Sequence, residues 1–145
     1  MKFVRATNYR HAEDIRKLRN LGRKGFSKDN SLITSEQQKK WWKKNADSVV
    51  AYLYYDGEIP VGYCMLKLLC GKWWDSIAVS PLYRGHGIGK KVLGYVIRKV
   101  DNDVWSVVRC ENKASRAIHV PEDWEELNGD GKFVNFRTWK GRKVD

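Results

Sequence analysis

The chain is poor in cysteine, and this shortage excludes two classes of protein. Cysteine occurs at only 3 of 145 positions, namely Cys64, Cys70 and Cys110. Three is an odd number, and no CxxC pair or cysteine and histidine spacing typical of a metal site is present. A disulfide-stabilised secreted domain and a zinc domain are therefore both disfavoured. We interpret the three cysteines as reduced thiols of the core and predict that no metal is bound.

Long apolar runs, prolines and linkers are also scarce. No apolar run approaches the roughly 20 residues of a membrane span, and the N-terminal segment 1–5 lacks the apolar core of a signal peptide. With 3 prolines and no repeat or low-complexity tract, nothing in the sequence divides the chain. We expect a cytoplasmic protein that does not bind membranes, folded as a single domain over residues 1–145, a common size for one domain.

Acidic residues are outnumbered, and the basic excess is uneven. There are 28 Lys and Arg against 17 Asp and Glu, a formal net charge of +11. Residues 1–48 hold 13 basic and 5 acidic side chains, a net +8, whereas residues 122–131 hold five acids and no base. Such a field attracts polyanions, so nucleic acid is one candidate partner.

Hydrophobic periodicity predicts an α+β chain. The segment Thr34–Gln37 has the residue types of a capping box, with Thr34 as N-cap and Gln37 at the third helical position, and the helix that it begins contains Trp41 and Trp42. Asp56-Gly57 and residues 128–131 are typical of hairpin turns. The predicted strands cover 3–7, 49–55, 61–69, 73–80, 104–110, 124–127 and 133–139, and the other predicted helices cover 9–22, 90–99 and 113–119.

The glycine-rich segment Arg84–Gly89 lies between the apolar strand pattern Ile77-Ala78-Val79 and an amphipathic helix. A strand that leads through glycines into a helix leaves backbone N–H groups and the positive end of the helix dipole available to an anion. A Walker loop would need Gly at position 84, and a dinucleotide fingerprint would need a small residue at position 90 or 92. Neither is present, so the segment predicts a phosphate site of another kind.

The pattern Arg-x-x-Gly-x-Gly after Val79-Ser80-Pro81 resembles the coenzyme A pyrophosphate loop of the GNAT superfamily, the GCN5-related N-acetyltransferases. The resemblance implies a GNAT-like fold, a mixed and mostly antiparallel sheet flanked by helices, with acetyl-CoA as cosubstrate. Part of the basic excess would then serve this anionic cosubstrate. The resemblance implies cofactor-binding roles for Ile77, Ala78, Val79, Arg84, Gly85, His86, Gly87, Ile88, Gly89 and, at the start of a later helix, Asn112.

The same resemblance suggests two catalytic residues. In the family, a tyrosine seven residues after the asparagine protonates the leaving thiolate; here that position is His119, which could supply the proton because both of its forms coexist near neutrality. A carboxylate must accept the proton of the acceptor amine. Asp75 is the first candidate, since the neighbouring Trp73 and Trp74 could partly bury it. Glu111 is the second.

The acceptor is expected to be an amine, in the first place on a small molecule. The segments Leu18-Arg19-Asn20, Phe26 and Ile33–Gln38 resemble a GNAT subgroup that includes acetyltransferases of nucleotide-linked amino sugars, and Trp41 or Trp42 could line the acceptor cleft. The alternatives are an acyltransferase acting on nucleic acid (a tRNA-linked amine or a modified base), a protein or peptide N-acetyltransferase, and a non-catalytic GNAT-like binding or structural protein. The chain could act as a monomer or a homodimer.

Overall fold

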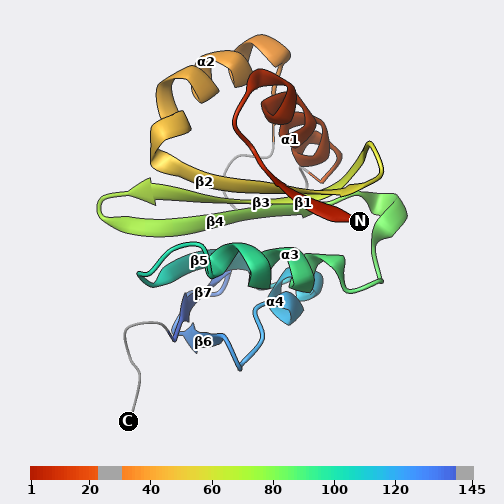
Figure 1. Cartoon of the computed structure of the whole chain (residues 1–145). Helices are drawn as coiled ribbons and strands as arrows, with labels where there is room; N and C mark the ends of the chain where they lie inside the picture. Colours follow the sequence, from red (N-terminus) through yellow and green to blue (C-terminus); the bar gives the residue numbers. More distant parts are fainter. Residues whose placement is uncertain (23–30, 140–145) are drawn as a thin grey trace.

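The computed structural model describes residues 1–22 and 31–139 and contains a sheet of seven strands (Figure 1). The strand order is β1-β2-β3-β4-β5-β7-β6, and every neighbouring pair is antiparallel except β4 and β5. The mixed, mostly antiparallel sheet predicted from the sequence is confirmed. The strands are β1 (Lys2–Arg5), β2 (Val49–Asp56), β3 (Ile59–Leu69), β4 (Lys72–Val79), β5 (Val104–Arg109), β6 (Trp124–Leu127) and β7 (Phe133–Thr138).

Two helices cover each face of the sheet, with α1 and α2 on one side and α3 and α4 on the other (Figure 1). Each predicted strand and helix is present in the described residues, and the bounds differ from those predicted by at most two residues. Two short 3-10 helices complete the described chain. The helices are α1 (Tyr9–Leu21), α2 (Ser35–Asn45), η2 (Ala46–Ser48), η3 (Pro81–Tyr83), α3 (Ile88–Ile97) and α4 (Lys113–Ile118).

Strand β3 separates two hydrophobic cores. Its residues point alternately to the two faces, so Cys64 and Leu66 pack with α3 while Tyr63 and Met65 pack with α1 and α2. The strand is therefore buried on both faces over residues 61–66. This double burial fixes the register of β3 against its neighbour β4, since a shift of one residue would exchange the two faces.

The helix N-termini are of two kinds. Asn8, Thr34 and Asn112 each accept a hydrogen bond from the first turn of α1, α2 and α4, and the predicted capping box of Thr34 and Gln37 is confirmed. Among the described α-helices, α3 alone has no side-chain cap, because Gly87 occupies its N-cap position with a φ of 75°. Its first-turn N–H groups are left for water or a ligand.

Strands β4 and β5 separate soon after they meet. Only two residue pairs join them, Trp73 with Val104 and Trp74 with Trp105, although β4 continues to Val79. The edge of β4 over residues 75–79 therefore forms no ladder with β5. Asp75 is the first residue beyond the last pair, at the point where the gap begins.

The prediction that all three cysteines lie in the core is wrong for Cys70, whereas Cys110 packs against the core. Cys64 is buried, but Cys110 is half-buried and Cys70 is exposed. Cys70 lies in the β3–β4 turn with a φ of 51°, so the backbone geometry of the turn outweighs the apolar character of the thiol. In the described part of the chain, no three His, Cys, Asp or Glu side chains cluster as they would around a metal, and no helix is long and apolar enough to cross a membrane.

Candidate active site

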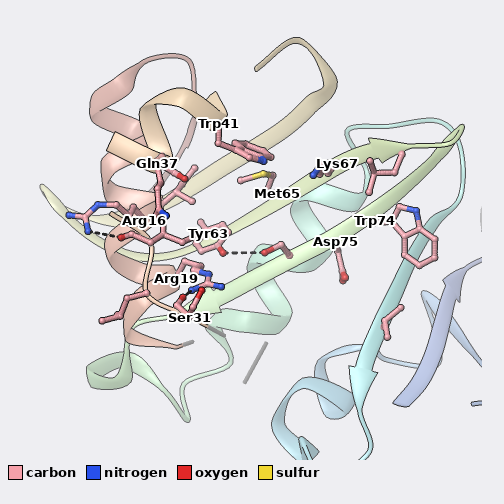
Figure 2. Close-up of a pocket in the computed structure, with 17 residues that line it drawn as sticks. Arg16, Arg19, Ser31, Gln37, Trp41, Tyr63, Met65, Lys67, Trp74 and Asp75 are labelled. Carbon is pink, nitrogen blue, oxygen red and sulfur yellow. Dashed lines mark hydrogen bonds between the residues drawn. The ribbon is translucent and has the colours of Figure 1, made fainter. Parts of the chain in front are cut away.

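Two cavities meet at the gap between β4 and β5. The first, which we call the loop cavity, has a volume of about 630 Å³ and lies among β4, the glycine-rich loop, α3 and α4. The second, the helix cavity, has a volume of about 510 Å³ and lies among α1, α2, β3 and β4 (Figure 2). Both volumes are typical of small-molecule sites. Three residues line both cavities: Asp75, Ser76 and Val107.

The loop cavity brings together almost all of the predicted cofactor-binding residues. Ile77, Ala78, Val79, Arg84, Gly85, Gly87, Ile88, Gly89 and Asn112 line it. His86 does not line it and is exposed. Gly85 and Gly87 have φ values of 81° and 75°, a region in which other residues are strained, so the tight turn of this loop requires glycine at both positions.

The electrostatics of the loop cavity favour an anion. The uncapped N-terminus of α3 opens into it, and the side chains of Arg84 and Lys90 line the same space. Backbone N–H groups and the helix dipole together bind phosphate-like groups, and a guanidinium strengthens such binding through charge-assisted hydrogen bonds. The sequence pattern did not single out Lys90, although its place directly after Gly89 in the first helical turn was a usable signal.

Asn112 lines the loop cavity but has a structural task as well. Its side-chain oxygen accepts a hydrogen bond from the backbone N–H of Ser115 at 3.0 Å and so caps α4. The cap fixes the direction of this six-residue helix. Because His119 follows directly after the helix, Asn112 also helps to place the histidine.

The two predicted catalytic residues lie in direct contact. His119 Nε2 is 3.0 Å from Asp75 Oδ2, and the exposed fractions of the two side chains are only 1% and 5%. The other ring nitrogen, Nδ1, is 2.6 Å from the backbone oxygen of Ser115. Trp124 and Phe136 pack against the imidazole, with ring centroids 4.6 and 4.8 Å away. Residues 44 positions apart thus form one buried pair at the junction of the cavities.

The contacts of His119 determine where its protons lie. A carbonyl oxygen only accepts hydrogen bonds, so Nδ1 carries a proton toward Ser115. The contact between Nε2 and the Asp75 carboxylate then requires one further proton, which the two groups share. Burial lowers the pKa of His119, but the hydrogen bond and charge of Asp75, with the Ser115 carbonyl, outweigh this effect and raise the pKa above its ordinary value of 6.5. The hydrogen bond between Nε2 and Asp75 therefore favours the protonated form of His119.

The helix cavity has an apolar floor with one cation. Residues of β3 that share a face supply the floor, and α2 contributes Trp41 (Figure 2). The ammonium nitrogen of Lys67 lies 5.2 Å from the centroid of the Trp41 ring, within the range of a cation–π contact. Trp42, by contrast, is 5% exposed and belongs to the core. The β3 side chains of the floor are Tyr63, Met65, Lys67 and Leu69.

The rim of the helix cavity is held by hydrogen bonds from α1. Arg16 pairs with Glu13 on the same helix and donates from Nη1 to the Ile33 oxygen at 3.1 Å. The hydrogen bond from Arg16 lowers the pKa of Glu13 to about 2. The Asn20 side chain both donates to and accepts from the backbone of Ile33, at 2.8 and 2.9 Å. These contacts tie the segment before α2 to α1, and Arg19 donates to the Ser31 oxygen in the same region.

Some predicted residues lie elsewhere, and some site residues were not predicted. Glu111, the second candidate base, is 81% exposed at its side chain, pairs with Arg109 and lines neither cavity. Phe26 lies outside the described residues. Sequence reasoning missed Lys67 and the hydroxyl contact of 3.1 Å between Tyr63 and Ser76, because both depend on the β3–β4 register.

The arrangement of the sheet and helices matches solved acetyltransferases. The structure of yncA from Salmonella typhimurium with its cofactor acetyl-CoA has a TM-score of 0.78, at 13% identity over 100% of this chain and 97% of that chain. A GNAT superfamily phosphinothricin acetyltransferase from Sinorhizobium meliloti, in complex with AcCoA, also has a TM-score of 0.78, at 15% identity over 99% of this chain and 91% of that chain. At such identities the likeness shows the fold, which is that of the acetyltransferases.

The family assignment comes from the sequence match. The model of the acetyltransferase (GNAT) family matches residues 14–120, which include the glycine-rich loop, Asp75 and His119. The chain belongs to this family. It is also 28% identical over 89 residues to the uncharacterized N-acetyltransferase YfmK of Bacillus subtilis (strain 168), a match that covers 61% of this chain and 59% of that relative.

Proposed function

We propose that the protein transfers an acetyl group from acetyl-CoA to the primary amine of a small-molecule acceptor. The observation that carries the proposal is the meeting of two cavities at a buried carboxylate and imidazole pair. One cavity has an anion-binding loop, and the other has the volume and mixed walls of an acceptor site.

The residues of the loop cavity fit acetyl-CoA. The N–H groups of the loop and of the first turn of α3 would bind the pyrophosphate, with Arg84 and Lys90 as charged partners. The edge of β4 over residues 77–79 is not paired with β5, so its backbone N–H and C=O groups would bind the amide groups of the pantetheine arm as a neighbouring strand would. When bound, acetyl-CoA supplies an acetyl group activated as a thioester.

The catalytic pair would handle both protons of the reaction. As the bond between the acceptor nitrogen and the acetyl carbon forms and the carbon–sulfur bond breaks, the amine loses one proton and the thiolate gains one. Asp75 would accept the first as a general base, since it lines both cavities, and His119 would donate the second. The proton left on Asp75 would then return to His119 through their hydrogen bond and restore the starting pair.

The experiment that tests this function has two parts. Calorimetry with acetyl-CoA should give saturable binding, and a thiol-release assay with a panel of primary amines should give turnover that ends when the amine is acetylated. Asp75→Asn should retain binding and lose most of the turnover. A folded protein that does not bind acetyl-CoA would overturn the proposal.

A nucleic-acid acceptor is the second candidate, because four exposed lysines follow one another along α2. They are Lys39, Lys40, Lys43 and Lys44. The tryptophans between them do not support base stacking, since Trp42 is buried in the core and Trp41 lines the helix cavity. The lysines therefore fit a solvated helix face better than a nucleic-acid surface, and a small-molecule acceptor is the function that we favour.

A further inference from the structure

Positive side chains outnumber negative ones in the lining of the helix cavity. The charged side chains that line it are Arg16, Arg19, Lys67 and Asp75. Two of them are engaged by partners that do not line this cavity: Arg16 pairs with Glu13, and Asp75 pairs with His119. Lys67 has no carboxylate partner within the part of the chain that the structure describes, and its ammonium lies over the ring of Trp41. Its ammonium is thus available to a ligand.

The register of the sheet places Lys67 and Asp75 at neighbouring positions on β3 and β4. Lys67 pairs with Trp74, which directly precedes Asp75, while Asp75 pairs with Leu66. Since cross-strand partners share a face, Lys67 lies on the floor of the helix cavity and Asp75 points to the other face, where the gap between β4 and β5 exposes it to both cavities. Lys67 is therefore one residue along β3 from the cross-strand partner of Asp75.

From this placement we propose that the acceptor is a small amine that carries its own anionic group, a carboxylate or a phosphoryl group, a few bonds from the nitrogen. The inference rests on the proposed function and specifies its substrate class. The amine of the acceptor lies at the opening beside Asp75, which accepts its proton, and the anion binds Lys67. The carbon skeleton packs on Trp41 and Met65, side chains that favour an apolar surface (Figure 2).

The same charges disfavour two other classes of acceptor. A polyamine would place a second ammonium beside Lys67, and like charges repel in a partly desolvated cavity. A neutral amine would leave the Lys67 ammonium without a counter-charge while its hydration is displaced. The selectivity of the cavity thus comes from one attractive contact and from repulsion of the wrong partner.

The test compares amines that differ only in the anion. The probes are phenylalanine with phenylalaninamide, leucine with leucinamide, and phosphoethanolamine with ethanolamine, plus spermidine, each with acetyl-CoA in a thiol-release assay. The wild-type protein should prefer the anionic member of at least one pair by about tenfold or more in kcat/KM, the effect expected of a charge-assisted hydrogen bond. Spermidine should be the poorest acceptor.

Substitution of Lys67 identifies the source of the preference. Lys67→Met replaces the lysine with an uncharged side chain of similar length, and it should reduce the ratio of kcat/KM for the anionic and neutral amines to about one. Lys67→Arg keeps the positive charge and should retain a preference for the anionic amine. The matched control is Lys72→Met, since Lys72 also lies over a tryptophan, 4.3 Å from the centroid of Trp105, but lines neither cavity. This control should keep the wild-type ratio.

The outcomes separate the two proposals. Equal kcat/KM for acids and amides would overturn the acceptor class while the acetyltransferase function stands. A preference that Lys67→Met leaves unchanged would overturn the role of Lys67 as the anion-binding group. If the protein binds acetyl-CoA but turns over no amine in the panel, both proposals fail together.

Discussion

At the scale of single residues, the buried pair of His119 and Asp75 is the feature from which the proposed mechanism follows. Both ring nitrogens of His119 are engaged, one by the Ser115 carbonyl and one by Asp75. To reach a thiolate, the histidine must exchange one of these hydrogen bonds for the sulfur. Its action therefore depends on its partner, and the two residues should behave kinetically as one group.

The first prediction follows from this dependence. Asp75→Asn and His119→Gln should each lower kcat by about a hundredfold to ten-thousandfold, and the double variant should be little worse than the poorer single variant. Both substitutions keep a polar group at the pair, so thermal unfolding can confirm that the variants fold. If the losses in the double variant multiply, the residues act independently.

A second prediction concerns stability against pH. Because the pKa of His119 is raised in the folded protein, the folded state holds this proton more tightly than the unfolded state does. The stabilisation is complete below the unfolded value near 6.5 and is lost as the pH rises through the folded pKa. Urea unfolding should show this decrease above pH 6.5, and His119→Gln should lack it. His86→Gln, which changes an exposed histidine, should retain it.

The sequence predicted the identity of both residues but not their contact. His119 was found from its spacing to Asn112, and Asp75 from its place before the loop. Their hydrogen bond spans 44 positions and depends on how α4 packs over the gap between β4 and β5. Local periodicity contains no information on such packing. Lys67 was missed for the same reason. Its neighbour Trp41 belongs to a helix that is distant in sequence. Its neighbour Trp74 is placed opposite it by the register of β3 and β4.

At the scale of elements, α3 differs from the other described helices at its N-terminus. Its N-cap residue Gly87 has no side chain to satisfy the first-turn N–H groups, whereas α1, α2 and α4 begin with a capping asparagine or threonine. Glycine at the N-cap in place of a capping Ser, Thr, Asn or Asp makes a helix less stable by about a few tenths of a kcal/mol. We attribute this cost to the binding of the cosubstrate.

The third prediction tests whether the loop before α3 binds the cosubstrate. Arg84→Glu should weaken acetyl-CoA binding by at least about 2 kcal/mol, because it replaces a charge-assisted partner with a repelling carboxylate. Calorimetry on the folded variant measures this difference. Lys40→Glu makes the same charge reversal at an exposed position outside both cavities and should leave the affinity nearly unchanged. Equal affinities for the wild type and Arg84→Glu would remove Arg84 from the binding site.

The fourth prediction concerns the hairpin of β6 and β7, which carries Trp124 and Phe136 against His119. A Cβ atom at Gly129 would lie 1.9 Å from the Phe133 oxygen, so Gly129→Ala must displace the turn. We expect a loss of about 1–3 kcal/mol in the free energy of unfolding. At Gly131, in the same turn, nothing lies within 4 Å of such an atom, and Gly131→Ala should have almost no effect. Similar losses in both variants would contradict this account.

Elements were easier to predict than their ends. Strand alternation, the capping box at Thr34 and the turn at residues 128–131 are local signals, and each gave the correct element. The start of α3 was predicted at Lys90 but lies at Ile88, because glycines in the loop carry no propensity signal for the helix. Cys70 falls between the predicted strands 61–69 and 73–80, so its place in a turn was a usable signal of exposure that the apolar character of cysteine outweighed.

At the scale of the whole molecule, the net charge of +11 has more than one possible use. Arg84 and Lys90 line the loop cavity, and Lys67 lines the helix cavity. The lysines of α2 line neither. The basic excess is therefore not a single surface with a single partner.

The fifth prediction separates these uses. Replacing Lys39, Lys40, Lys43 and Lys44 together with glutamate should leave kcat/KM for a small amine within about twofold, because exposed charges outside both cavities are screened by salt. Binding of RNA and DNA should be measured in parallel across a salt series. If the wild-type protein binds nucleic acid and each lost lysine lowers the slope of log K against log salt by about one, the hypothesis of a nucleic-acid acceptor replaces that of a small-molecule acceptor.

The two cavities share few lining residues, and this affects how the sequence of the protein can change in evolution. Among the residues that the structure describes, 17 line the helix cavity, and of these only Asp75, Ser76 and Val107 also line the loop cavity. If the helix cavity binds the acceptor and the loop cavity the donor, as proposed, mutations on α1, α2 and β3 would change which amine is accepted while the donor site remains intact. Selection, or a directed-evolution library restricted to these elements, could explore new acceptors without first losing the donor.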